Sequence, residues 1–178
     1  LGFGAACMGD GNFDIVYDMA ATDRKMMAAC GLHIMYGPQV DVSTDPRWPR
    51  NSGTYGERPE ITAGITRELI RGYQNGEDGL KEGAIALTVK HFPGDGVDDR
   101  NQHFCTTVND MTREEWMATY GRLYKTMIAE GAEAVMSAHI ALPWCDPTFD
   151  ECGNMSASLS KVLMTDLLKG ELGFDGCI

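Results

Sequence analysis

The sequence predicts an α/β fold, namely a partial (β/α)8 barrel of the TIM type with parallel strands. Helix-like and strand-like segments alternate along its 178 residues, so that a helix connects each strand to the next, as parallel strands require. The loops that follow the strands are long and polar, whereas those that follow the helices are mostly short. This asymmetry is typical of a barrel whose functional site lies at the carboxyl ends of its strands.

In the first half of the chain, the apolar pattern predicts two helices and two strands. Residues 13–30 place apolar side chains on one stripe at helical spacing. Residues 32–36 form a short apolar run of strand length. Pro59 suits the first turn of a second helix, which ends at about Gln74. Residues 84–89 are apolar at nearly every position and predict a buried strand.

The second half of the chain repeats this alternation. Thr112 is followed three residues later by Glu115, which forms the capping box that begins a helix. Ser158 is a candidate N-cap for the last helix. The predicted helices are residues 112–128 and 158–168, and the predicted strands are residues 134–138 and 176–178.

We expect residues 1–178 to form one incomplete barrel domain that lacks its first and last strands. About four strands are visible in the sequence, whereas a complete eight-stranded barrel takes roughly 250 residues. The chain also begins with Leu1 rather than Met and ends on a strand-like segment at Ile178, which indicates a fragment. No signal peptide is visible near Leu1, so the compartment stays open between cytoplasmic and secreted.

The composition excludes several classes of protein. The chain has 26 acidic and 15 basic side chains, for a net charge of −11, and 43% of its residues are hydrophobic. This apolar fraction excludes general disorder. The negative charge argues against a nucleic acid or a membrane as partner, because no basic patch is available to neutralise phosphates. The apolar runs are also far too short to span a bilayer.

Three loops that follow strands hold most of the chemically active side chains. The first, residues 41–50, combines aspartate, arginine and tryptophan. A guanidinium can hold two ring hydroxyls of a sugar, and an indole can stack on the sugar's apolar face. The loop therefore suits a sugar site. A loop fixed only by Arg–Asp ion pairs is the other interpretation, and this segment alone favours it.

The second loop follows the buried strand and runs from Lys90 to His103. Lys90 and His91 stand where a cation would be buried unless a polar ligand partnered it. A turn at residues 93–96 could carry His103 back over the pocket, which makes His103 a candidate general acid/base. A solvated acidic loop and a metal site are competing interpretations. The metal ligands would be His91, Asp95, Asp98, Asp99 and His103.

The third loop begins at His139, directly after the third predicted strand. The His139 imidazole either lines the floor of the pocket, where it would contact substrate, or has a purely structural role. His33 stands at the start of a strand, and therefore at the opposite end of the barrel, where we expect a structural role.

Three sequence motifs follow one another along the chain. Residues 45–50 read DPRWPR and are followed by TYGE at 54–57, residues 90–96 read KHFPGDG, and residues 156–160 read SASLS and lead to ELGFDG at 171–176. In this order they resemble the DPRWGR…TFGEDP, KHFPG(H/D)G and PATLS…ELGFDG stretches of glycoside hydrolase family 3. The resemblance covers nearly the whole chain, from about residue 9 to residue 178.

This resemblance implies an exo-acting, retaining β-glycosidase that takes a glycoside or oligosaccharide and needs no cofactor or metal. By analogy, Arg50, Lys90 and His91 bind hydroxyls of the terminal sugar. In the β-N-acetylglucosaminidase branch an Asp-x-His dyad is the general acid/base, and its histidine falls on His103. The family nucleophile is an Asp shortly after GFDG, beyond Ile178, so we expect these 178 residues alone to be inactive.

The dyad departs from the family pattern because Asn101 stands at the Asp position. An amide oxygen can orient an imidazole but cannot stabilise imidazolium as a carboxylate does. Either Asp98 or Asp99 takes that role, or the acid is weakened. The KHFPGDG motif and His103 favour a β-N-acetylhexosaminide substrate, and β-glucoside or β-xyloside ranks second. A sugar-binding remnant without catalysis is the non-enzymatic alternative.

Overall fold

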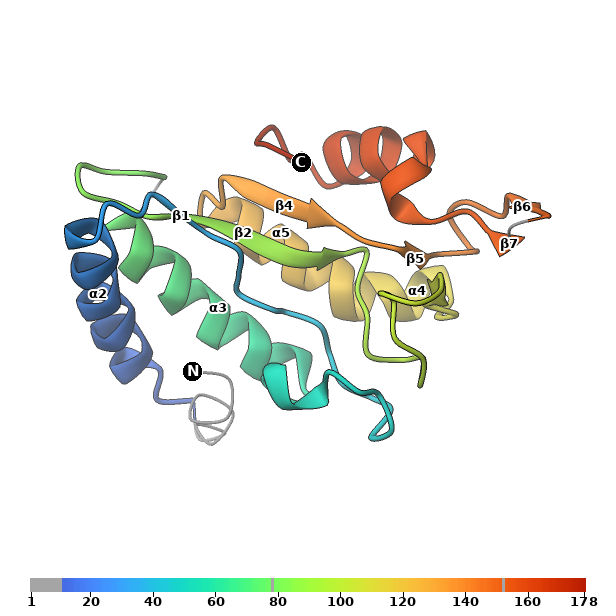
Figure 1. Ribbon diagram of the computed structural model, residues 1–178, viewed down its shortest axis with the longest axis horizontal. Helices are drawn as coiled ribbons and strands as arrows, with labels where there is room; N and C mark the ends of the chain where they lie inside the picture. Colours follow the sequence, from blue (N-terminus) through green and yellow to red (C-terminus); the bar gives the residue numbers. More distant parts are fainter. Residues whose placement is uncertain (1–10, 78, 152) are drawn as a thin grey trace.

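The computed structural model describes residues 11–77, 79–151 and 153–178. At its centre is a parallel sheet with the strand order β1-β2-β4 (Figure 1). The predicted α/β class with parallel strands is confirmed, whereas the strands of the described residues do not close a barrel. The three strands are β1 (Ile34–Met35), β2 (Ala86–Phe92) and β4 (Ala134–Ser137).

The chain continues beside β2 after β1 has ended. A parallel bridge joins Gln39 to Lys90, so that the segment after β1 runs alongside the carboxyl end of β2. The predicted last strand is reduced to one parallel bridge, between Ala134 and Cys177. The segments that follow β1, β2 and β4 therefore leave the sheet at the same end.

Helices α2, α3 and α5 lie side by side against the sheet (Figure 1). Helix α3 begins at Pro59, as the sequence predicts, and ends at Asn75, whose left-handed φ of 64° is typical of a helix C-terminus. Gly72 lets α2 and α3 approach closely, because a Cβ at this position would overlap Ala20. The bounds are α2 (Asp14–Ala29), α3 (Pro59–Gln74) and α5 (Arg122–Ala129).

The predicted capping box at the start of the third long helix is confirmed. The Thr112 hydroxyl accepts a hydrogen bond from the Glu115 N–H at 3.2 Å, and a Glu115 carboxylate oxygen accepts one from the Thr112 N–H at 2.8 Å. The helix then continues without a break through α4 (Arg113–Trp116), the π-helical η2 (Met117–Gly121) and α5.

The predicted N-cap at Ser158 is wrong. The Ser158 hydroxyl donates to the carbonyl of Ala138 at 2.9 Å, within the short 3-10 turn η3 (Ala157–Leu159). The last helix, η4 (Val162–Glu171), begins later, and the Ser160 hydroxyl accepts from the Leu163 N–H at 3.0 Å. Two serines with the same capping chemistry stand two residues apart, and sequence alone does not choose between them.

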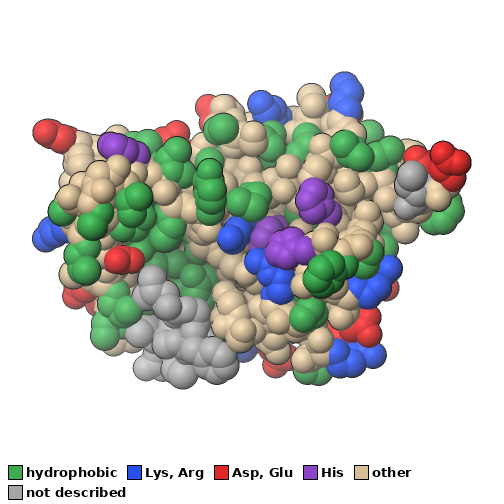
Figure 2. Space-filling view, viewed as in Figure 1, with side chains coloured by type: hydrophobic (Ala, Val, Ile, Leu, Met, Phe, Trp, Pro, Cys, Tyr) green, Lys and Arg blue, Asp and Glu red, His purple; other side chains and the backbone are tan. Residues whose placement is uncertain are grey.

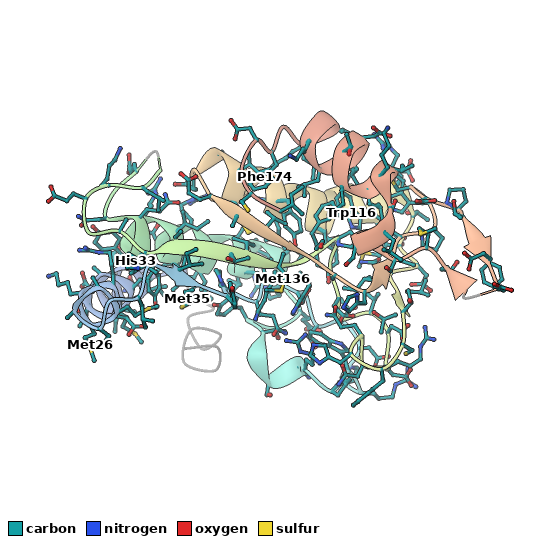
Figure 3. All side chains as sticks on the ribbon, turned by 45° about the horizontal axis from the view of Figure 1, so that its top comes forward. Met26, His33, Met35, Trp116, Met136 and Phe174 are labelled. Atoms are coloured by element: carbon teal, nitrogen blue, oxygen red, sulfur yellow. The ribbon has the colours of Figure 1, made fainter. Side chains whose placement is uncertain are left out.

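The hydrophobic core lies between the sheet and the helices. Phe92, at the end of β2, packs edge-on against Tyr124 and Trp116, with ring centroids 5.0 Å and 6.2 Å away. The other face of the sheet forms a groove lined by residues of β1, β2 and β4, among them Ile34, Thr88 and Met136. Met136 is labelled in Figure 3. No helix in the described part of the chain has the length and apolar character to cross a membrane.

Two short pairings complete the structure. Strand β3 (Thr107–Val108) pairs in parallel with β5 (Ile140–Ala141), which joins the loop after β2 to the segment after β4. Strand β6 (Phe149–Asp150) pairs with β7 (Gly153–Asn154) in an antiparallel hairpin. The first pairing brings two of the three candidate loops together.

Candidate active site

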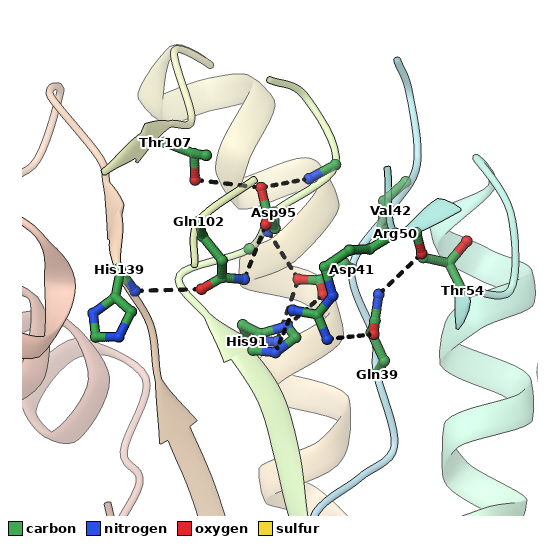
Figure 4. Close-up of polar contacts among 12 residues, drawn as sticks. Gln39, Asp41, Val42, Arg50, Thr54, His91, Asp95, Gln102, Thr107 and His139 are labelled. Atoms are coloured by element: carbon green, nitrogen blue, oxygen red, sulfur yellow. Dashed lines mark hydrogen bonds and ion pairs between the residues drawn. The ribbon is translucent and has the colours of Figure 1, made fainter. Parts of the chain in front are cut away.

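The three candidate loops meet at the carboxyl ends of the strands (Figure 4). They are residues 41–50 after β1, residues 90–103 at the end of β2 and beyond it, and the segment that begins at His139 after β4. Arg50 Nη1 lies 3.0 Å from His91 Nε2, Lys90 is the sequence neighbour of His91, and the charges of Arg50 and Lys90 act on the imidazole of His103, so the structure brings these four residues together. Figure 2 shows histidine side chains gathered beside Lys and Arg side chains on this face.

A chain of hydrogen bonds links Asp41, His91 and Arg50. His91 Nδ1 lies 2.7 Å from Asp41 Oδ2, and His91 Nε2 lies 3.0 Å from Arg50 Nη1. Because a guanidinium only donates, Nε2 must accept, and the ring proton must lie on Nδ1, where it is donated to Asp41. His91 is therefore a neutral imidazole with both ring nitrogens occupied.

Asp41 is fully buried and anchors this chain. Its Oδ1 accepts backbone hydrogen bonds from His91 at 3.3 Å and from Asp95 at 2.8 Å. Such donors offset the cost of burying a carboxylate. Asp41 was not among the site residues that the sequence indicated. A signal was present, because a carboxylate between Val40 and Val42 at a strand end is unusual.

Arg50 and Lys90 offer positive charge that no carboxylate of the described residues neutralises. Arg50 Nη2 donates to Gln39 Oε1 at 3.2 Å, which orients the guanidinium. Lys90 is partly buried, and its ammonium makes no hydrogen bond or ion pair with another described residue. Burial lowers the pKa of Lys90, Arg50 lowers it further, and Asp41 opposes the shift. Both groups can therefore donate to the hydroxyls of a ligand.

His103 is exposed. Burial lowers the pKa of its imidazole, and the positive charges of Arg50 and Lys90 lower it further. The imidazole makes no hydrogen bond with the residues that the structure describes. Asn101 Oδ1 instead accepts from the backbone N–H of His103 at 3.0 Å. Asn101 thus holds the backbone of His103 and not its ring.

The two carboxylates that could replace the dyad Asp are both paired with arginine. Asp98 forms an ion pair with Arg100, whose hydrogen bond lowers the pKa of Asp98 to about 2. Asp98 also accepts from the Val108 N–H at 2.9 Å. Asp99 lies 3.6 Å from Arg47. Both carboxylates therefore interact with an arginine and not with the His103 ring.

His139 lies on the far side of Gln102 from Arg50 and His91 (Figure 4). Its backbone N–H donates to Gln102 Oε1 at 3.4 Å, and its exposed imidazole has no hydrogen-bond partner among the described residues. Within the described ranges, no group of three or more His, Cys, Asp or Glu side chains is arranged to hold a metal ion. The competing interpretation of the loop as a metal centre therefore has no geometric support there.

Two glycines allow the loop after β2 to fold tightly against its neighbours. Gly94 and Gly96 have φ angles of 116° and 107°, which favour glycine. A Cβ at Gly94 would overlap the ring of Tyr120, and one at Gly96 would overlap the carbonyl of Val42. The buried Tyr120 hydroxyl accepts from the Val42 N–H at 3.0 Å and donates to the Asp95 carbonyl. The glycines thus fix the base of the loop that carries His103.

Comparison with known sequences identifies the family. The model described as "Glycosyl hydrolase family 3 N terminal domain" matches residues 3–178. A protein of Cellulomonas fimi named "Beta-N-acetylglucosaminidase/beta-glucosidase" is 31% identical over all of this chain and 31% of its own length. "Beta-glucosidase C" of Emericella nidulans is 35% identical over 92% of this chain and 26% of its own length.

Solved structures agree with the sequence comparison. A β-glucoside phosphorylase is 35% identical with a TM-score of 0.84, and the match covers 97% of this chain and 30% of the other. A family 3 β-N-acetylglucosaminidase from Paenibacillus sp. is 30% identical with a TM-score of 0.84, covering 99% and 31%. The chain thus spans about a third or less of these four relatives. It belongs to glycoside hydrolase family 3, as its motifs indicate, and matches the N-terminal domain of that family.

Proposed function

We propose that the complete protein is an exo-acting, retaining β-glycosidase whose terminal sugar binds between Arg50 and Lys90, with His103 as general acid/base. The observation that carries this proposal is the convergence of Arg50 and Lys90, which have no carboxylate partner among the described residues, with the exposed His103 imidazole at the carboxyl ends of parallel strands. Such donors suit the ring hydroxyls of a pyranose. The same end of the strands holds the active site in barrel enzymes.

In this proposal the Asp41–His91–Arg50 chain positions the sugar-binding guanidinium. Asp41 fixes the His91 tautomer, and His91 Nε2 in turn accepts from Arg50. His103 would protonate the departing glycosidic oxygen and later accept a proton from the attacking group. The nucleophile would be the family aspartate that follows the GFDG motif, a position beyond Ile178.

The preferred substrate is a β-N-acetylhexosaminide. The basis is the KHFPGDG motif together with His103, and β-glucoside or β-xyloside is the second candidate. A panel of 4-nitrophenyl glycosides with the complete enzyme separates them. We expect the highest kcat/KM on the N-acetylglucosaminide. A higher value on the glucoside or xyloside would move the assignment to the second candidate.

Phosphate is a second candidate for the acceptor in place of water. One solved relative is a β-glucoside phosphorylase, and the pocket of this chain combines Arg50, Lys90 and an imidazole acid/base. An imidazole that has given up its proton is neutral and does not repel an anion, whereas a carboxylate would. Turnover measured with and without inorganic phosphate, with sugar 1-phosphate as the diagnostic product, decides between the two acceptors.

A sugar-binding protein without catalysis is the remaining alternative. It would keep Arg50, Lys90 and His91 while losing turnover. His103→Ala in the complete enzyme distinguishes the two. For an enzyme, this variant loses kcat/KM by about 100-fold or more on a substrate with a poor leaving group. For a binding protein, the wild type shows no turnover, and the variant binds sugar as the wild type does.

A further inference from the structure

We propose that Gln102 and Asp95 are positioning residues that hold His103 over the bound sugar. Neither residue is expected to touch the substrate, since both are almost fully buried, at 3% and 1% exposure. The inference rests on the proposed function, because it assigns a role relative to the acid/base. It gives a role in the acid/base machinery to two residues that had none: Asp95, which lies within the KHFPGDG motif, and Gln102, which lies between Asn101 and His103.

Gln102 forms a buried bridge between the loop after β2 and the segment after β4 (Figure 4). Its Nε2 donates to Asp95 Oδ2 at 2.9 Å, and its Oε1 accepts from the backbone N–H of His139 at 3.4 Å. Both ends of the amide are thus hydrogen-bonded, one to the loop after β2 and the other to the segment after β4. The side chain spans the two loops as a single rigid connection.

Asp95 is held firmly enough to serve as the fixed end of this bridge. Its Oδ1 accepts from the Gly96 N–H at 3.0 Å and from the Thr107 hydroxyl at 3.5 Å. Its own backbone N–H donates to the buried carboxylate of Asp41 at 2.8 Å. The bridge therefore connects to Asp41, the same aspartate that orients His91. The loop that carries His103 and the guanidinium of Arg50 are thus both fixed by hydrogen bonds that lead to Asp41.

The bridge sets the position of His103 because the two residues are adjacent. Gln102 is buried whereas His103 is exposed, so the fixed Gln102 side chain restrains the backbone that carries the exposed His103 imidazole. Asn101 adds a second restraint at the backbone N–H of His103. With its ring free of hydrogen bonds within the described residues, His103 depends on these backbone restraints for its place. A displacement of about 1 Å at a catalytic group can cost 100-fold in rate.

The first test compares two leaving groups in the complete enzyme. A phenyl glycoside needs an acid to protonate its leaving oxygen, whereas a 2,4-dinitrophenyl glycoside hardly does. We expect Gln102→Ala to lower kcat/KM on the phenyl glycoside by about 30- to 100-fold and on the dinitrophenyl glycoside by less than about threefold. Gln74→Ala is the matched control. Gln74 is equally buried and donates to the Glu130 carbonyl at 3.0 Å, far from the site. Any loss of kcat/KM in the Gln74→Ala variant, relative to wild type, should therefore be the same for the two glycosides.

The second test exchanges the donor and the acceptor of the bridge. Asp95→Asn leaves an amide N–H that faces another donor, either the Gly96 N–H or the Gln102 amide N–H, and Gln102→Glu places two carboxylates opposite each other, so each single variant breaks the bridge. In the double variant, an amide at position 95 again donates to a carboxylate at position 102, which can still accept from His139. We expect each single variant to lose at least about tenfold on the phenyl glycoside and the double variant to return to within about threefold of wild type.

These outcomes separate this inference from the proposed function. If wild type turns over both glycosides but Gln102→Ala loses equally on each, or the double variant shows the product of the two single losses, then Gln102 and Asp95 do not position the acid. If wild type turns over neither glycoside, the proposed function fails and this inference fails with it. Recovery in the double variant attributes the single losses to the hydrogen bond between positions 95 and 102, and a loss confined to the phenyl glycoside attributes them to the acid, since misfolding would lower the rates on both substrates.

Discussion

His91 shows how neighbouring side chains determine the role of one residue. In isolation a histidine beside a lysine suggests a sugar ligand or a proton carrier. The contacts with Asp41 and Arg50 instead fix it as a neutral link with no ring nitrogen free. Its role in the proposed site is to orient Arg50, and the free donors are then Arg50 and Lys90.

Removing the charge of Asp41 should weaken both the fold and the pocket. Asp41→Asn places an amide N–H against the backbone N–H groups of His91 and Asp95 or against the His91 ring. At least one buried donor then loses its acceptor, which costs about 1–3 kcal/mol. Urea unfolding of the complete protein should show this loss, together with a raised KM. An unchanged unfolding midpoint would contradict the role given to Asp41.

The pH dependence of activity should follow His103. An acid must be protonated to act, and the fraction protonated falls as pH rises through its pKa. Burial and the charges of Arg50 and Lys90 lower the pKa of His103, so kcat/KM should decline with rising pH below the usual histidine range. A pH profile of the complete enzyme measures this decline.

Asn101→Asp should move that decline to higher pH. A carboxylate beside His103 favours imidazolium and raises the pKa of the ring. It can still accept the backbone hydrogen bond that Asn101 accepts now. Activity at neutral pH should therefore rise. If kcat/KM of the variant declines at the same pH as in the wild type, or if its rate at neutral pH is lower, the result would contradict an acid role for His103.

At the scale of elements, the sequence predicted what depends on local chemistry. Pro59 and the Thr112–Glu115 capping box mark helix starts, and both are confirmed. Ser158 was indistinguishable from Ser160 by sequence, since the choice depends on where the Ala138 carbonyl lies. The roles of Asp41 and Gln102 were not predictable, because each bridges segments far apart in the sequence.

The turn at residues 93–96 should tolerate no side chain at Gly96. Gly96→Ala would force a Cβ into the Val42 carbonyl at a φ of 107°, so we expect a loss of more than about 1 kcal/mol in unfolding free energy and a loss of activity. Gly170→Ala is the control. It lies in η4, where the nearest atom to a Cβ is 3.4 Å away, and replacing glycine inside a helix should be neutral or gain about 0.5–1 kcal/mol. Equal effects of the two substitutions would contradict this account of the turn.

At the scale of the whole molecule, the described residues leave one face of the sheet uncovered. Its inner side is a groove that includes the exposed side chains of Ile34 and Tyr36, at 58% and 73% exposure. In a closed barrel such residues pack inside. The chain spans about a third or less of the length of its relatives. The proposed activity therefore belongs to the complete protein.

The 178 residues alone should therefore be inactive. A retaining glycosidase needs a carboxylate nucleophile as well as an acid, and the nucleophile that we propose is an aspartate that follows the GFDG motif and is not among these 178 residues. The isolated polypeptide should give no turnover of a 4-nitrophenyl β-glycoside, whereas the complete enzyme should. Turnover by the isolated polypeptide clearly above background would show that another carboxylate within it acts as the nucleophile.

The most direct test of the central claim is a structure of the complete enzyme with a non-hydrolysable thio-linked disaccharide. We expect hydroxyls of the terminal sugar to lie within hydrogen-bond distance of the Lys90 ammonium and the Arg50 guanidinium. The His103 imidazole should face the linking sulfur. A complex in which His103 points into solvent while a carboxylate occupies its place beside the sulfur would contradict the account.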